Sequence, residues 1–259
     1  MNIVVCIKQV PDAKDVRLDP VTNTLAREGV ASIMNPFDRH ALEEGVRLKE
    51  TLGGTVTALS MGPPQAEAVL REAISLGADR GVLVSDRAFA GADTWATSYT
   101  LARAIDTLGG VELVLCGKQA IDGDTAQVGP GLAHRLGLAY VTCVQKVRQA
   151  EAARLVVERM MDDGYDVVEL PLPALLTVVK DINEPRVPSL KGKMRAKSAD
   201  ITVLSAAAIG ADPACIGLAG SPTRVVRVFA PPPRGNRQVF GGSAAEQVEQ
   251  LLASLQGTL

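Results

Sequence analysis

Aromatic residues are scarce in this chain, and their scarcity excludes several kinds of binding protein. Only 3% of the 259 residues are aromatic: four Phe, three Tyr and one Trp. Grooves that bind single-stranded nucleic acid depend on stacked rings, and sugar-binding clefts are disfavoured for the same reason. The charge agrees, because 27 basic and 29 acidic residues give a net charge of −2, without the basic surplus of a nucleic-acid-binding domain. We therefore expect no nucleic acid among its partners.

Long hydrophobic runs are also missing. No run of about 18 apolar residues occurs, so we expect a chain that does not span a membrane. The apolar stretch within residues 1–10 is too short for a secretory signal and lacks a small-residue cleavage site. These absences predict a cytoplasmic protein.

Cysteine and histidine are few and widely spaced. The four cysteines never form a C-x-x-C pair, and His40 and His134 are the only histidines. A zinc or iron–sulfur site is therefore not expected. A Ser-His-Asp or Cys-His catalytic set is equally hard to build, so a hydrolase is a distant alternative. Cys6 and Cys116 lie inside apolar runs, where small buried thiols are common.

Apolar runs alternate with helical patterns over the first half of the chain. Four continuous apolar runs are typical of parallel strands covered on both faces; they span residues 3–7, 56–59, 81–84 and 113–116. Periodicity of 3.6 residues predicts helices over residues 40–51, 65–76, 94–108 and 127–136. This alternation predicts an α/β fold with a doubly wound, mostly parallel sheet. Right-handed crossovers then place every strand-to-helix turn at one edge.

The pattern changes after about Leu138. Four further strands with hairpin-like turns predict an antiparallel extension of the sheet; they span residues 140–147, 154–159, 165–169 and 174–179. A basic, loop-like stretch follows over residues 180–197. Pro222 and the prolines at 231–233 then mark a linker. An amphipathic helix is predicted over residues 243–255, with one apolar face formed by Val248, Leu251, Leu252 and Leu255.

The turns after the four apolar strands resemble helix starts. Asn35-Pro36 is a capping residue followed by proline at the first helical position. The longest turn, residues 117–129, has glycines that allow backbone N–H groups to approach a ligand, and its helix start favours a phosphate. Thr125 and Gln127 could bind phosphate oxygens, and Asp122 or Asp124 a ribose hydroxyl.

This turn matches neither G-x-G-x-x-G nor G-x-x-x-x-G-K-[ST]. Its residues could therefore be turn and cap formers alone. Two long Gly/Asp/Thr turns at one edge of an open α/β sheet nevertheless form the crevice in which such sheets bind nucleotides.

Several uncommon strings give the chain a resemblance to a known family. They are VCIKQV at residues 5–10, MNPFD at 34–38, LGADR at 76–80, GKQAID at 117–122 and NEPR at 183–186. Together they resemble the β subunit of electron transfer flavoprotein over nearly the full length. The implied fold is adenine-nucleotide α-hydrolase-like, with residues 1–220 as a nucleotide- or flavin-binding α/β domain. Residues 221–259 would be a C-terminal arm and helix packing on the α subunit.

The resemblance implies a heterodimer in which the α subunit holds an electron-carrying FAD and the β subunit an adenine nucleotide. The implied nucleotide-binding residues lie in the turns described above. They are Cys6, Asn35, Pro36, Phe37, Asp38, Met61, Asp93, Thr94, Thr97, Gly117, Asp122, Gly123, Asp124, Thr125, Ala126, Gln127 and Val128.

The family has two branches. In ordinary members the β-subunit nucleotide is a structural AMP, and electrons pass from acyl-CoA dehydrogenases to a quinone reductase. In bifurcating members it is a second FAD, which takes a hydride from NADH and splits the electron pair. One electron goes to a low-potential carrier, ferredoxin or flavodoxin, and the other passes through the α-subunit FAD to an acyl-CoA or quinone-linked dehydrogenase. The chain resembles the bifurcating branch at residues 85–97 and 122–130, which favours FAD.

Two further residues acquire roles through the resemblance. Arg87 would lie near the flavin ring and tune it; a solvated loop arginine is the alternative. Leu190, in a stretch with six basic residues, would dock a partner dehydrogenase. Met160 departs from the family, because many members have an acidic residue after the pair that corresponds to Glu158-Arg159.

The expected protein is an electron carrier and not a complete enzyme by itself, although it could form part of an NADH-dependent bifurcating oxidoreductase. A stand-alone adenine-nucleotide sensor of similar build is the alternative from another class. The isolated C-terminal helix and the Leu190 stretch argue against it.

Overall fold

The computed structural model describes residues 1–12, 17–18, 25–26, 31–226, 235 and 237–256. The chain divides into two compact units. One comprises Met1–Arg17 and Ala26–Val226, and the other Leu18–Leu25 and Arg227–Leu259. The prolines at 231–233, which the sequence assigns to a linker, lie outside the described residues.

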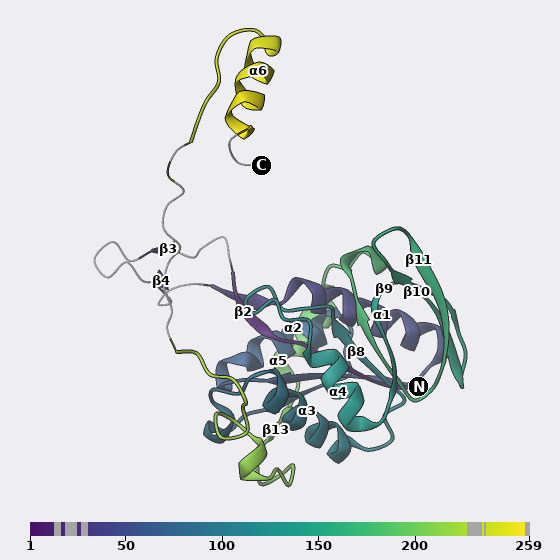
Figure 1. Ribbon diagram of the computed structural model, residues 1–259. Coiled ribbons are helices and arrows are strands. Elements are labelled where there is room, and N and C mark those ends of the chain that lie inside the picture. Colours follow the sequence, from purple (N-terminus) through teal and green to yellow (C-terminus); the bar gives the residue numbers. More distant parts are fainter. Residues whose placement is uncertain (13–16, 19–24, 27–30, 227–234, 236, 257–259) are drawn as a thin grey trace. The chain divides into compact units, whose positions relative to one another are not determined.

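Nine of the described strands form one sheet in the larger unit (Figure 1). Its order is β11-β10-β9-β12-β8-β1-β6-β7-β13. The bounds are β1 Asn2–Cys6, β6 Thr55–Met61, β7 Arg80–Val84, β8 Leu113–Gly117, β9 Ala139–Ala150, β10 Arg154–Met160, β11 Tyr165–Pro171, β12 Ala174–Val178 and β13 Ile201–Leu204. All neighbours are parallel except β9–β10 and β10–β11. The predicted doubly wound, mostly parallel sheet with an antiparallel extension is confirmed.

Strand β12 corrects one part of that prediction. We expected it in the antiparallel extension, but it lies between β8 and β9 and runs parallel to both, with Ala174 opposite Leu113 and Ala139. All five of its residues are buried, as in a strand covered on both faces. The short connection between β11 and β12 suggested an antiparallel hairpin, but these two strands are not neighbours in the sheet. The edge strand β13, which pairs with β7, was not predicted.

Helices cover both faces of the sheet. They are α1 Pro36–Leu52, α2 Glu67–Leu76, α3 Thr94–Leu108, α4 Val128–Leu136 and α5 Leu190–Ser198. Side chains alternate along β1, so Val5 belongs to the buried cluster that also holds Leu42 of α1 and Ile74 of α2. Val4 instead joins the cluster that holds Leu101 of α3 and Leu132 of α4. Helices α1 and α2 therefore cover one face, and α3 and α4 the other (Figure 1).

The stretch predicted as a basic loop contains a helix. After a 3-10 turn, η3 (Lys180–Ile182), helix α5 begins at Leu190. Ser189 caps it by accepting the Gly192 N–H at 3.0 Å. Arg195 donates to the carbonyls of Ile74 and Ala78 in and beyond α2. The sequence prediction of a loop missed α5, although Ser189 is a local N-cap signal and tertiary hydrogen bonds also hold the helix against α2.

Shorter elements complete the described chain. They are β2 Gln9–Pro11, β3 Arg17–Leu18, β4 Leu25–Ala26, β5 Ser32–Met34, η1 Pro64–Ala66, η2 Arg87–Phe89, η4 Pro213–Cys215 and α6 Ala244–Leu255. The C-terminal helix agrees with its prediction and begins with a capping box formed by Ser243 and Glu246. Within the described residues, no helix is long and apolar enough to cross a membrane.

Candidate functional site

Asp38 joins three elements at the carboxyl edge of the sheet. It lies in the first turn of α1, and its Oδ2 accepts the Lys8 N–H at 2.8 Å, just beyond β1. Its Oδ1 accepts the N–H of Gly117, the last residue of β8, at 3.1 Å. A Cβ at Gly117 would overlap this oxygen and Phe37. Burial raises the pKa of Asp38 to about 7, although hydrogen bonds from Asn35, Lys8 and Gly117 act in the opposite direction.

Asn35 supports the long turn that follows β8. Its buried side chain donates to the Gln119 carbonyl at 2.9 Å and accepts the Ile121 N–H at 3.2 Å. Beside it, Lys8 Nζ forms an ion pair with Asp122 Oδ1 at 2.7 Å. The turn is therefore held in place by side chains from β1's end and α1's start, two elements that precede it by more than 80 residues.

The same turn presents a row of backbone donors. Asp124 and Ala126 have left-handed backbone conformations, with φ of 52° and 54°. Non-glycine residues rarely adopt this conformation, and it clusters at ligand sites. Within the described chain, the N–H groups of residues 125–129 donate no intramolecular hydrogen bond. They precede or open α4, so the turn has the donors and the helix dipole that a phosphate requires.

The turn between β7 and α3 meets this long turn. Thr94 Oγ1, at the start of α3, donates to Gln127 Oε1 at 2.8 Å. Asp93 caps α3 by accepting the N–H groups of Trp95 and Ala96 at 2.9 and 3.1 Å. Two turns that the sequence predicts at one edge are thus joined by a direct hydrogen bond.

The strand ends bring the remaining predicted residues to this edge. Cys6 ends β1 directly opposite Cys116 of β8. The Cys6 thiol and burial raise the pKa of Cys116, which keeps that thiol protonated and unreactive. Met61 ends β6 opposite Val84 of β7.

The positions of several other predicted site residues do not test the cofactor roles that the sequence gives them. Phe37 is half-buried and lies under Lys180, whose Nζ is 4.9 Å from the ring centroid. Thr97 lies in the first turn of α3, and its N–H donates to the Asp93 carbonyl. Gly123 and Thr125 are exposed within the long turn. Arg87 is exposed in η2.

Comparisons with known proteins identify the family. An electron transfer flavoprotein domain matches residues 22–209. The chain belongs to the electron transfer flavoprotein family. It is 50% identical over 256 residues to an electron transfer flavoprotein subunit beta from Thermoanaerobacterium thermosaccharolyticum, covering 98% of each chain. It is 49% identical to the caffeyl-CoA reductase-Etf complex subunit CarD of Acetobacterium woodii, covering 98% of this chain and 97% of the relative.

A third relative is protein FixA of Azotobacter vinelandii, which is 49% identical and matches 92% of this chain and 86% of its own length. The resemblance read from the sequence is therefore confirmed. Electron transfer flavoprotein β subunits associate with a flavin or nucleotide and pair with an α subunit.

One string shared with the electron transfer flavoproteins has a clear structural use. Arg186 pairs with Glu43 Oε2 at 2.8 Å and with Glu50 Oε1 at 2.6 Å. Asn183 donates to the His40 carbonyl and to Glu44 Oε2, each at 3.0 Å. The NEPR string thus fastens the segment before α5 to α1. The acidic partners on α1 were not predicted from the sequence.

Leu190 is the first residue of α5, and 77% of its surface is exposed. Met194, one turn later, and Val187 are also largely exposed. Arg71 donates to the Ala196 carbonyl at 2.6 Å and so fixes the other end of the helix. The electron transfer flavoprotein chain therefore presents a small apolar group on a fixed helix. The i, i+4 spacing of Leu190 and Met194 could have revealed the pair in advance.

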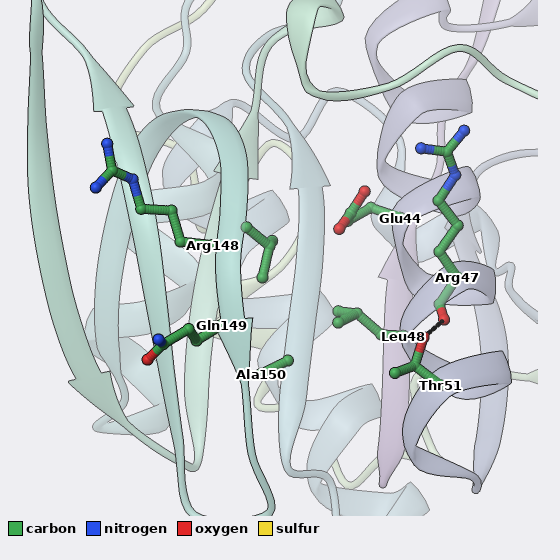
Figure 2. A pocket seen from close by; sticks show the side chains of 8 residues that line it. Glu44, Arg47, Leu48, Thr51, Arg148, Gln149 and Ala150 are labelled. Carbon is green, nitrogen blue, oxygen red and sulfur yellow. Dashed lines mark hydrogen bonds between the residues drawn. The ribbon is translucent and has the colours of Figure 1, made fainter.

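A separate cavity of about 200 Å³ lies between α1 and the end of β9 (Figure 2). Figure 2 shows Glu44, Arg47 and Thr51 on the α1 side, facing Arg148, Gln149 and Ala150. None of its lining residues belongs to the predicted nucleotide site. Burial raises the pKa of Glu44, although its hydrogen bond from Asn183 opposes this. The cavity is thus distinct from the edge where the turns meet.

Proposed function

We propose that this β subunit binds FAD at the carboxyl edge of its sheet, takes electrons from NADH there, and distributes them in a bifurcating complex. One electron would reach ferredoxin or flavodoxin. The other would pass through the FAD of the α subunit to an acyl-CoA or quinone-linked dehydrogenase. The observation that carries the proposal is the row of free N–H groups at residues 125–129, at the start of α4.

The donor row fits a phosphate or pyrophosphate. Consecutive N–H groups beside a helix N-terminus bind such anions without any positive side chain. Two left-handed residues aim the row, and Asn35 and Lys8 hold the turn in place. Because the supports come from other elements, the donors are ordered before a ligand binds, which lowers the entropic cost of binding.

Bound FAD would supply the redox chemistry, and the chain's residues would bind and orient it. The exposed Arg87 stands in the turn before α3, beside the small Gly91-Ala92 step. A cation there would favour negative charge on a reduced ring. The strings at residues 85–97 and 122–130 support FAD over AMP.

The alternative is an ordinary electron transfer flavoprotein with structural AMP at this edge. AMP also carries a phosphate, so the donor row suits either nucleotide. Two features favour the bifurcating form: the branch-specific strings, and the 49% identity to a subunit of a complex named for caffeyl-CoA reductase. That name also supports a CoA-ester reductase or dehydrogenase as a partner.

Quantifying the cofactors of the purified heterodimer tests this proposal. Acid release followed by chromatography should yield two FAD per heterodimer. One FAD and one AMP would reject the bifurcating form in favour of the ordinary one. No nucleotide beyond the FAD of the α subunit would reject the nucleotide site itself.

A further inference from the structure

Asp93 uses both carboxylate oxygens within the chain. Oδ1 accepts the N–H groups of Trp95 and Ala96, which caps α3. Oδ2 accepts the Thr223 N–H at 3.0 Å and the Thr223 Oγ1–H at 2.9 Å. Burial alone would raise the pKa of Asp93, but hydrogen bonds from Ala96, Thr223 and Trp95 outweigh it and hold the pKa below its ordinary value. The carboxylate is therefore charged, and its bonds to Thr223 are charge-assisted.

Thr223 belongs to a segment that closes over the turn before α3. The Asp93 N–H donates to Ser221 Oγ at 2.8 Å, and Ser221 Oγ in turn donates to the Gly217 carbonyl at 2.6 Å. The Leu218 N–H donates to the Ala90 carbonyl at 3.1 Å. Residues 217–223, which we call the arm root, are thus bound to the β7–α3 turn at several points. The chain continues from the arm root into the second unit, which includes α6.

The other side of Asp93 leads to the phosphate-binding turn. The next residue, Thr94, donates to Gln127 Oε1 at 2.8 Å. Ser98 Oγ donates to the Thr94 carbonyl at 2.7 Å and lies 3.4 Å from the Val128 carbonyl. A displacement of Asp93 would therefore move the N-terminus of α3 and, through Thr94, the donor row at residues 125–129.

We propose that Asp93 is a positioning residue that couples the arm root to the nucleotide site. The coupling rests on the proposed function, since it requires a nucleotide at this edge and an arm that contacts the α subunit. When the α subunit holds the arm, the arm root is fixed, Asp93 is fixed by Thr223, and the donor row is ordered. Nucleotide and α subunit then strengthen each other's binding, because coupling between two sites is reciprocal.

Titration with AMP and with FAD, on the full β chain alone and on the heterodimer, tests the coupling. In the wild type we expect the α subunit to tighten nucleotide binding about 5- to 150-fold, the usual range for coupled sites. Asp93→Asn retains the oxygen that caps α3 but loses the acceptor for Thr223, so the ratio of the two dissociation constants should fall below about threefold. Thr223→Val leaves Asp93 and its cap intact and should give an intermediate ratio.

Asp212→Asn is the matched control. Asp212 caps η4 in the segment just before the arm root by accepting the Ala214 N–H, and its carboxylate does not bond Asp93. Its ratio should equal that of the wild type. If the α subunit did not change the dissociation constant of the wild-type chain, the coupling would be overturned. It would also be overturned if Asp93→Asn and Thr223→Val both kept the same ratio of dissociation constants as the wild type. Failure of both nucleotides to bind either form would instead reject the proposed nucleotide site.

Discussion

Asn35 and Ile121 lie 86 positions apart in the chain, yet the Asn35 side chain accepts the Ile121 N–H at 3.2 Å. The same amide donates to the Gln119 carbonyl at 2.9 Å, so one buried side chain satisfies two backbone groups of the long turn. A buried amide bonded in this way stabilises the turn and fixes its position relative to α1. The proposed nucleotide site would therefore depend on the start of α1 as much as on the turn itself.

Gly117→Ala should destabilise the protein and weaken nucleotide binding. The added methyl group would overlap the Asp38 carboxylate and the Phe37 backbone, and such overpacking typically costs about 1–3 kcal/mol. Urea unfolding monitored by circular dichroism measures the change. Gly123→Ala is the control in the same turn, because a Cβ there meets no atom within 4 Å. Equal destabilisation by both variants would contradict the close approach at Gly117.

Asp38 should make stability depend on pH. Its pKa is about 7 in the folded chain and 3.8 in the reference state, so the folded state binds the proton more tightly. The stabilisation is complete below about pH 4 and is lost as the pH rises to about 7. The free energy of unfolding should fall across this window by at most about 1.4 kcal/mol per pH unit. Chemical unfolding at several pH values measures the slope, which Asp38→Asn should reduce. An unchanged slope would exclude Asp38 as its source.

Arg186→Ala should destabilise the segment before α5 strongly. It would leave Glu43, whose side chain is 4% exposed, paired only with Arg47 at Oε1, and leaving a buried charge fully unpaired costs about 3–5 kcal/mol. Because Arg47 remains and Arg186 is partly exposed, about 2 kcal/mol is expected. Arg154→Ala is the control, because Arg154 pairs with two exposed glutamates, Glu151 and Glu169. Thermal unfolding should show a smaller change for the control, below about 1 kcal/mol.

Leu190→Ala should slow electron transfer between the heterodimer and its partner dehydrogenase about tenfold if Leu190 is a central anchor of the docking contact, because truncating such a hot-spot residue costs over about 1 kcal/mol. Flavin content should remain unchanged because Ser189 and Arg71 cap the two ends of α5 and Arg195 bonds it to α2, without a contribution from Leu190. Stopped-flow assays with the purified partner measure the rate. Val203→Ala, an exposed change on β13, should leave it unaltered. Similar losses in both variants would argue against a specific anchor.

Arg87→Ala should slow flavin reduction by NADH about tenfold, as expected for loss of one electrostatic stabiliser. Arg87→Lys keeps the positive charge and should restore most of the rate. Anaerobic stopped-flow absorbance of the heterodimer gives both values. Unchanged spectra and rates in Arg87→Ala would show that the side chain is only a solvated loop arginine.

Local sequence determined much of this molecule. Continuous apolar runs indicated the parallel strands, because a strand covered on both faces needs apolar residues at every position. Residue type also marked local geometry: Asn35-Pro36 indicated the start of α1, and Gly117 indicated a turn. Pro130 indicated the start of α4, and it does lie in the first turn of that helix. The family strings predicted a site at the carboxyl edge; the structure brings its turns together there, and the cofactor roles of their residues stay predictions.

Only the tertiary structure decided the features that depend on distant partners. The place of β12 between β8 and β9 follows from burial on both faces, which spacing to the preceding strand does not reveal. Arg195 and Arg71 bond helix α5 to α2. These two hydrogen bonds join segments more than 100 residues apart, so the sequence of α5 does not reveal them. Folding also brings Thr223 to the second carboxylate oxygen of Asp93, 130 positions away, and the sequence does not indicate this hydrogen bond. Hydrogen bonds between residues so far apart leave no periodic trace in a sequence, because their geometry arises only when the sheet and its helices have assembled.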